Sequence, residues 1–266
     1  MSTRPLIIGH RGASAIAPEN TLAAFARAMR EGADGIEFDV RLAADGVAVV
    51  IHDATLQRTG SVSGIVSKLS SEELGRIDVG SWFDRQPRDS SQRASGRFSN
   101  ETVPSLQQVF DLFIHNQGSL YLEMKGEPQD DDRLAQLVVR QIKDNSFVNR
   151  VVVESFDLPI IELVKSIDPT VRTAALFEPK LSHPSSLLRT RLPQRAVACG
   201  ADEIALHHTL ASAATIRNAR ELGLKVVVWT VDDPDWVIKA QDLDIHALIT
   251  NHPARLVARQ RDASVV

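Results

Sequence analysis

Short apolar runs rich in Val, Ile and Leu alternate along the chain with longer segments whose apolar residues recur at helical spacing. Runs of the first kind are typical of strands, and segments of the second kind are typical of helices. The predicted strands are 5–9, 35–40, 47–51, 119–124, 150–155, 171–177, 203–207, 225–230 and 245–250. Strands that alternate with helices in this way predict a parallel sheet with helices packed against it.

A helix is predicted between most of these strands. In the first of them, positions 22, 25, 26 and 29 place apolar side chains on one face, and Asn20 or Thr21 could cap it. A second has Pro104 in its first turn, a position that tolerates proline. The predicted helices are 21–31, 104–116, 130–145, 157–167, 184–199, 211–222, 233–242 and 252–260.

One of the nine predicted strands does not fit a parallel sheet. Runs 35–40 and 47–51 are joined only by residues 41–46, whereas a parallel crossover needs about a dozen residues or more. They therefore predict an antiparallel hairpin, and Asp45-Gly46 indicates a type I′ turn. Without run 47–51, eight parallel strands remain, which is the number in a TIM barrel of roughly 250 residues. We expect an α/β chain that forms one (β/α)8-barrel domain over residues 1–266.

One segment interrupts the alternation of strands and helices. No helix of barrel length is evident from residue 53 to residue 103, and the tract 84–102 is polar and rich in Arg and Ser. We interpret about 53–103 as an insertion at the C-terminal face of the strands. The role of the polar tract stays open.

Charged residues stand inside strands that are otherwise apolar. Glu37 and Asp39 are two residues apart, so they share one face of their strand, about 6.6 Å apart along it. Glu123 and Lys125 repeat this spacing on the next parallel strand. Such residues are depleted from strands and are almost never fully buried without a partner. They could be exposed edge charges or a simple Lys125–carboxylate pair, but together they favour a site.

Three converging carboxylates without a thiolate suit a hard divalent cation, Mg²⁺ or Ca²⁺, better than zinc. The hairpin adds His52 to this group. A two-residue loop at 45–46 would place His52 opposite Asp39, and a four-residue loop at 43–46 would place it opposite Glu37. Either register brings His52 within cross-strand reach of the acidic pair.

His10 ends the first strand, next to the second strand of a barrel, and Arg11 follows it. Two histidines beside a metal suit phosphoryl chemistry, because one can take a proton from the attacking oxygen while the other protonates the leaving alcohol. A metal, an arginine and a lysine would hold the anionic phosphate.

Composition excludes several other classes of protein. The 34 acidic and 30 basic residues give a net charge of −4, so no overall basic field favours nucleic acid as a partner. Cys199 is the single cysteine, which excludes an intrachain disulfide and a cysteine-based zinc site. No apolar stretch approaches the 18 residues of a membrane span and no secretory signal is recognisable, so we expect a cytoplasmic protein without a transmembrane segment. The oligomeric state stays open.

Several motifs together resemble the glycerophosphodiester phosphodiesterase family. The segments that carry the resemblance occur in the right order over most of the chain, and the region 10–60 is the most specific. They are HRGASAIAPENT (10–21), GIEFDV (35–40), HD (52–53), GSWF (80–83), LEMK (122–125), SFD (155–157), WTV (229–231) and ALIT (247–250).

The resemblance implies a TIM barrel of the phospholipase-C-like phosphodiesterase type. It implies one divalent metal ion held by Glu37, Asp39 and Glu123, with His10 and His52 as the acid–base pair. Arg11 and Lys125 would bind phosphate. Trp229 and Phe156, at strand ends, are candidates to contact the glycerol moiety, with packing as the alternative.

The implied substrate is a small glycerophosphodiester, such as glycerophosphocholine or glycerophosphoethanolamine. Its hydrolysis gives sn-glycerol 3-phosphate and an alcohol, and the neighbouring glycerol hydroxyl could attack first to give a cyclic phosphate. Which histidine is the base stays open, as do the preferred alcohol, the metal and the role of His207 and His208.

Two alternatives remain. The same chemistry would serve a lysophospholipase D-like enzyme if the apolar residues of 61–83 formed a lipid channel rather than a core for the insertion. A catalytically silent barrel could instead bind phosphorylated metabolites, although such a barrel should have lost acid, base or metal ligands that are all present here.

Overall fold

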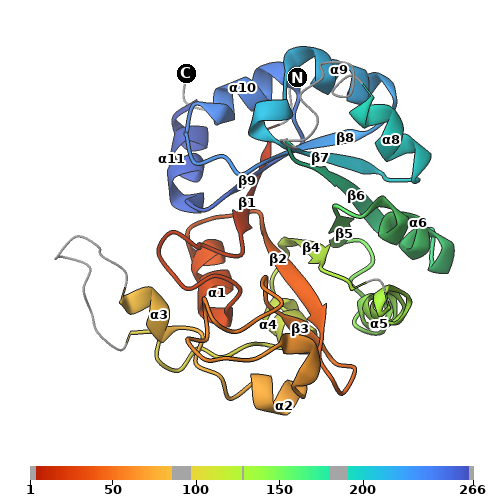
Figure 1. Cartoon of the computed structure of the whole chain (residues 1–266). Coiled ribbons are helices and arrows are strands. Elements are labelled where there is room, and N and C mark those ends of the chain that lie inside the picture. The colour runs from red at the N-terminus through yellow and green to blue at the C-terminus, as the bar shows by residue number, and fades with distance from the viewer. Residues whose placement is uncertain (1–3, 86–96, 128, 180–190, 264–266) are drawn as a thin grey trace.

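The computed structural model describes residues 4–85, 97–127, 129–179 and 191–263. Eight parallel strands form a closed barrel, because β1 pairs with β9 on one side and with β2 on the other. The prediction of a TIM barrel is confirmed (Figure 1). In chain order, the parallel strands are β1 (Leu6–His10), β2 (Gly35–Leu42), β4 (Ser119–Met124), β5 (Val151–Ser155), β6 (Arg172–Phe177), β7 (Glu203–His207), β8 (Lys225–Trp229) and β9 (Ala247–Thr250).

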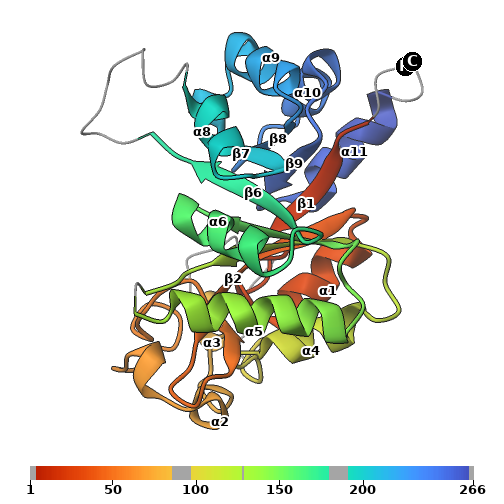
Figure 2. The ribbon, with the colours of Figure 1, turned by 90° about the vertical axis from the view of Figure 1, so that its right-hand side faces the viewer.

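The barrel helices lie on the outside of the strands, as Figures 1 and 2 show. These helices are α1 (Leu22–Arg30), α4 (Leu106–Phe113), α5 (Asp131–Asp144), α6 (Leu158–Ile167), α8 (Leu192–Ala198), α9 (Ala213–Glu221), α10 (Trp236–Leu243) and α11 (Pro253–Ala263). The part of predicted helix 184–199 that precedes residue 191 lies outside the described residues. None of the helices within the described ranges is both long and apolar enough to cross a membrane.

One helix start decides between two predicted caps, and another differs from its prediction. The side chain of Thr21 caps α1 by accepting a hydrogen bond from the backbone N–H of Ala24, which leaves Asn20 available for another role. Helix α4 does not contain Pro104 in its first turn. Ser105 caps it in a capping box with Gln108, so the helix begins two residues after the proline.

The hairpin is present, but its turn and register differ from both predictions. Strand β3 (Ala48–Val50) pairs antiparallel with β2, with Val40 opposite Val50. Of the loop residues only Gly46 has a positive φ, 80°, whereas a type I′ turn needs a positive φ at both central residues. The loop is therefore of the three-residue kind. The pairing ends at Val50, so His52 lies beyond the ladder and opposite neither carboxylate.

Two apolar layers support the barrel. Its interior is filled by a cluster that includes Tyr121, Val152 and Val227, and separate clusters lie between the strands and the helices. The hydroxyl of Tyr121 donates to Oε2 of the buried Glu203 at 3.0 Å, and Glu203 is the first residue of β7, at the end of that strand opposite to its C-terminal end. The filled interior leaves the C-terminal strand ends as the place for a site.

The segment after the hairpin has a small core of its own. It contains a 3₁₀ turn, η1 (Val66–Lys68), and two short helices, α2 (Ser71–Leu74) and α3 (Ser81–Asp84). Val66 and Leu74 pack with Leu56 and with hairpin residues, and Phe83 is buried, whereas Val62 and Ile65 are exposed. Most of these apolar side chains are thus used for packing. Residues 86–96 of the polar tract lie outside the described residues.

Gly12 permits the close contact between the β1–α1 loop and α1. Its φ is 85°, and a Cβ there would lie 2.6 Å from the backbone carbon of Ala24. We expect Gly12→Ala to lower the free energy of unfolding by about 2–5 kcal/mol, from backbone strain plus overpacking. Gly223 has a φ of 83°, and a Cβ added there would meet nothing within 4 Å, so Gly223→Ala is the matched control. Urea denaturation measures both, and equal losses would contradict the packing role of Gly12.

Candidate active site

Three carboxylates converge at the C-terminal ends of two neighbouring strands. Glu37 and Asp39 lie on β2, and the β2–β4 register places Glu123 beside Asp39. One oxygen from each of the three lies within 4.8 Å of the others, and all three side chains are buried. The spacing of charges along the strands therefore produces one compact acidic cluster.

Two cations lie against this cluster. The Nε of Arg11 is 3.2 Å from Oδ2 of Asp39, and its backbone N–H donates to Oε2 of Glu37 at 3.0 Å. Arg11 adopts a positive φ of 52°, which turns both groups toward β2. The Nζ of Lys125 is 2.5 Å from Glu123 and 3.3 Å from Asp39. Asn20 completes the surroundings of Asp39 by donating to Oδ2 at 2.8 Å.

The carboxylates differ in their affinity for protons. Burial opposes ionisation of Asp39, but Arg11 and Lys125 outweigh it and hold the pKa of Asp39 well below its usual range. Burial and the charge of Asp39 raise the pKa of Glu123 to about 7. The same two causes raise the pKa of Glu37 well above its usual value. Without a further cation, the structure therefore opposes ionisation of all three carboxylates at once.

The donor set fits a hard divalent cation. Each of the three residues supplies a carboxylate oxygen, which is the ligand type that Mg²⁺ and Ca²⁺ prefer. Oδ1 of Asp39 is buried and receives no hydrogen bond, although it forms the ion pair with Lys125. Because this buried oxygen accepts no hydrogen bond, it can bind a metal without giving one up. The cluster can therefore hold a metal ion.

His10 ends β1 beside Glu37. Its Nδ1 lies 2.7 Å from the side-chain oxygen of Asn251, and its Nε2 lies 3.8 Å from Oε2 of Glu37. Burial, together with the charge of Arg11, lowers the pKa of His10 to about 4. At neutral pH the imidazole is therefore neutral and can accept a proton.

His52 reaches the site from the segment after the hairpin. The side chain of Arg41 donates from Nε to the backbone carbonyl of His52 at 2.8 Å, which fixes the chain where the strand pairing has ended. Nδ1 of His52 lies 2.6 Å from Oδ1 of Asp53. Burial lowers the pKa of His52, while the charges of Asp39 and Asp53 act in the opposite direction. Whereas Nδ1 of His10 faces a neutral amide, Nδ1 of His52 is hydrogen-bonded to a carboxylate that can stabilise the protonated form.

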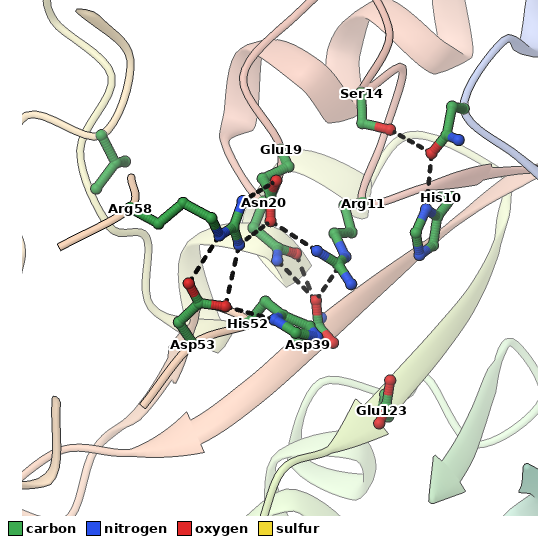
Figure 3. Close-up of polar contacts among 12 residues, drawn as sticks. His10, Arg11, Ser14, Glu19, Asn20, Asp39, His52, Asp53, Arg58 and Glu123 are labelled. Atoms are coloured by element: carbon green, nitrogen blue, oxygen red, sulfur yellow. Dashed lines mark hydrogen bonds and ion pairs between the residues drawn. The ribbon is translucent and has the colours of Figure 1, made fainter. Parts of the chain in front are cut away.

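A chain of ion pairs connects the surroundings of His52 with those of Arg11 (Figure 3). The guanidinium of Arg58 lies between Asp53 and Glu19, with Nε 2.7 Å from Asp53 and Nη1 2.6 Å from Glu19. Glu19 also accepts from Nη1 of Arg11 at 2.7 Å. Arg58, which belongs to the insertion, thus links the partner of His52 to the partner of Arg11.

A hollow of about 440 Å³ brings these groups to one space. At its edge, the rings of Phe156 and Trp229 meet edge to face with centroids 5.5 Å apart, and Lys125 Nζ lies 5.6 Å from the centre of the Phe156 ring. His207 packs edge to face on Trp229. The lining residues are His10, Arg11, Glu37, His52, Glu123, Lys125, Glu154, Phe156, Leu176, Glu178, Trp229 and Ile249.

Some contributors to this site were not predicted from the sequence. Glu154 lies beside Glu123 in the β4–β5 register and is buried, and its position within an apolar strand is the same signal that identified Glu37. Asn20 was considered only as a helix cap. Arg41 follows Asp39 at the same two-residue spacing and Asn251 directly follows the last predicted strand, so both had a signal in the sequence. Arg58 had none, because its contact with Glu19 joins segments far apart in the chain.

The barrel and its charged strand ends define the chain as a TIM-barrel phosphodiesterase. The family model described as "Glycerophosphoryl diester phosphodiesterase family" matches residues 10–255, and the chain belongs to this family. It is accordingly a hydrolase, a glycerophosphodiester phosphodiesterase.

Known relatives match this chain along nearly its whole length. A glycerophosphodiester phosphodiesterase of Caldanaerobacter subterraneus subsp. tengcongensis is 31% identical over 259 residues, which cover 96% of this chain and 97% of the relative. A crystal structure of the Agrobacterium tumefaciens enzyme is 28% identical with a TM-score of 0.76 and covers 96% and 99% of the two chains. A phosphodiesterase of Oleispira antarctica, in complex with the product sn-glycerol-3-phosphate, shares the fold at 23% identity and a TM-score of 0.80, with 96% of each chain covered.

Arg58 offers a test of the ion-pair chain. We expect Arg58→Gln to lower kcat about tenfold, because Asp53 and Glu19 lose the cation between them and His52 loses its fixed partner. The control is Arg76→Gln, which removes an exposed arginine that pairs only with Glu72 on the surface among the contacts described. Steady-state kinetics on a glycerophosphodiester measure both variants. Unchanged kcat in Arg58→Gln would show that the chain of ion pairs does not position the site.

Proposed function

We propose that this protein hydrolyses small glycerophosphodiesters, such as glycerophosphocholine or glycerophosphoethanolamine, to sn-glycerol 3-phosphate and an alcohol. The observation that carries the proposal is the hollow in which two differently partnered histidines face an acidic cluster and two cations. The product complex of the Oleispira antarctica relative supports the same class of substrate.

One Mg²⁺ or Ca²⁺ ion would be held by Glu37, Asp39 and Glu123. When bound, such an ion polarises the phosphate oxygens and stabilises the charge that develops during transfer. The ammonium of Lys125, which here neutralises Asp39 and Glu123, then donates to the phosphate together with Arg11. Phe156 and Trp229 provide an apolar edge for the carbon atoms of the glycerol moiety.

The partners of the two histidines suggest that His10 acts first as the base and His52 as the acid. His10 faces a neutral amide and takes the proton from the glycerol hydroxyl that attacks phosphorus. His52, which has the carboxylate of Asp53 behind it, donates a proton to the alcohol oxygen as its bond to phosphorus breaks. The product of this step is a cyclic phosphate. Water then opens the ring with the two histidines in reversed roles, and both return to their starting states.

The described residues favour this function over the two alternatives. A lipid channel in the insertion would need many unburied apolar side chains, whereas Val66, Leu74 and Phe83 are buried and only Val62 and Ile65 are exposed among the large apolar residues described in 61–83. A silent binding barrel would need an incomplete site, whereas the histidines and all three carboxylates meet at one hollow or directly beside it.

Release of glycerol 3-phosphate from glycerophosphocholine tests the proposal. We expect turnover by the wild type with Mg²⁺ or Ca²⁺, loss of turnover with a chelator, and a fall of about 10²–10⁴-fold in His10→Ala and His52→Ala. His115→Ala is the control, since His115 is exposed and precedes the N-terminal end of β4, whereas Glu123 lies near the C-terminal end of that strand.

Four results would contradict the proposal. Turnover that is insensitive to the chelator would remove the metal from the mechanism, and full activity in both histidine variants would remove the acid–base pair. Tight binding of glycerol phosphate without turnover of any diester would support the silent barrel. Faster turnover of lysophosphatidylcholine than of glycerophosphocholine would support the lysophospholipase D-like alternative.

A further inference from the structure

Asn251 and Asp232 form a chain of hydrogen bonds that ends on His10. Strand β9 lies next to β1, with Gly9 opposite Thr250, so the residue after β9 lies beside the end of β1. The side-chain oxygen of Asn251 thereby comes to 2.7 Å from Nδ1 of His10. Neither Asn251 nor Asp232 lines the hollow that contains the acidic cluster. Both line a neighbouring hollow that His10 and Arg11 also border, and the hydrogen bond between Asn251 and His10 is their described contact with the residues around the acidic cluster.

The amide of Asn251 has only one favourable orientation. Its Nδ2 donates to Oδ2 of Asp232 at 2.8 Å, and its Oδ1 accepts from the hydroxyl of Ser14 at 2.8 Å. Rotation of the amide by 180° would place an oxygen against the carboxylate, which is an acceptor only when ionised. The amide oxygen must therefore face His10.

Asp232 is itself fixed in position. Its Oδ1 accepts from the hydroxyl of Thr250 at 2.9 Å and from the backbone N–H of Asn251 at 2.8 Å. Burial opposes its ionisation, but the hydrogen bonds from Asn251 and Thr250 outweigh burial and lower the pKa of Asp232. The chain therefore begins at an ionised carboxylate with a fixed direction.

An amide oxygen opposite Nδ1 requires that this nitrogen carry the proton. Resting on the function proposed above, we propose that Asp232 and Asn251 are positioning residues that hold neutral His10 as its Nδ1–H tautomer, with the unprotonated Nε2 on the side of Glu37 and the substrate. In the other tautomer, two acceptors would face each other at Nδ1 and the nitrogen facing the attacking hydroxyl would already carry a proton. His10 could not then accept the proton of that hydroxyl.

The tautomer can be observed directly in the wild type. Long-range ¹H–¹⁵N correlation spectra at neutral pH, with His10 assigned through His10→Gln, report which imidazole nitrogen carries the proton. We expect Nδ1 to be protonated and Nε2 to be unprotonated. A protonated Nε2 in neutral His10 would overturn the inference. This measurement needs no substrate, so it decides the inference even if the protein releases no glycerol 3-phosphate.

Steady-state kinetics on variants of Asp232 and Asn251 test whether this chain of hydrogen bonds affects turnover. In Asp232→Asn the ionised acceptor is lost and the amide of Asn251 can rotate, so we expect kcat to fall about ten- to a hundredfold with KM little changed. In the double variant Asp232→Asn, Asn251→Asp, a carboxylate at 251 again accepts from Nδ1 of His10 and from an amide at 232. We expect this variant to recover most of the lost kcat and the wild-type tautomer.

Thr250→Val is the matched control for a structural role. It removes one hydrogen bond to the same carboxylate but leaves the Asn251 amide paired with Asp232, so we expect a much smaller loss of kcat than in Asp232→Asn and the same tautomer of His10. Urea denaturation of all variants separates stability from turnover. The inference fails if Asp232→Asn keeps the wild-type kcat, or if Thr250→Val loses as much kcat as Asp232→Asn does.

Discussion

The attraction between a buried acidic cluster and two cations is the interaction on which the site depends. A buried charge is costly unless it is paired and hydrogen-bonded. Asp39 is paired with both Arg11 and Lys125, whereas burial and the nearby charge of Asp39 raise the pKa values of Glu37 and Glu123. The barrel thus concentrates negative charge that a proton can relieve in part and a divalent cation can relieve fully.

The same interaction organises the loops around the barrel mouth. Arg11 adopts a positive φ so that its backbone N–H reaches Glu37 while its side chain reaches Asp39, and Gly12 lets the loop pack closely on α1. Arg58 extends the network to Asp53 and hence to His52. The insertion after the hairpin therefore supports one of the two histidines, His52. The other histidine is supported from β9, on the opposite side of β1.

The sequence predicted the barrel because burial imposes a simple pattern on each strand and each helix. It also predicted that charges at strand ends would converge, since the C-terminal ends of parallel strands meet at one face. The hairpin register could not be predicted, because it depended on whether Asp45 adopts a positive φ. The partners of the histidines could not be predicted either. Asn251 and Asp232 meet His10 only after β9 has closed the barrel against β1.

Binding of a divalent cation is the sharpest test of the role given to the acidic cluster. Isothermal titration of the metal-free wild type with Mg²⁺ and with Ca²⁺ should show that one of the two ions binds to a single site per chain. The substitution Glu123→Gln keeps the shape of the side chain but removes one of the three carboxylates, and it should weaken that binding strongly. Failure of the wild type to bind either ion, or equal binding by Glu123→Gln, would contradict that role.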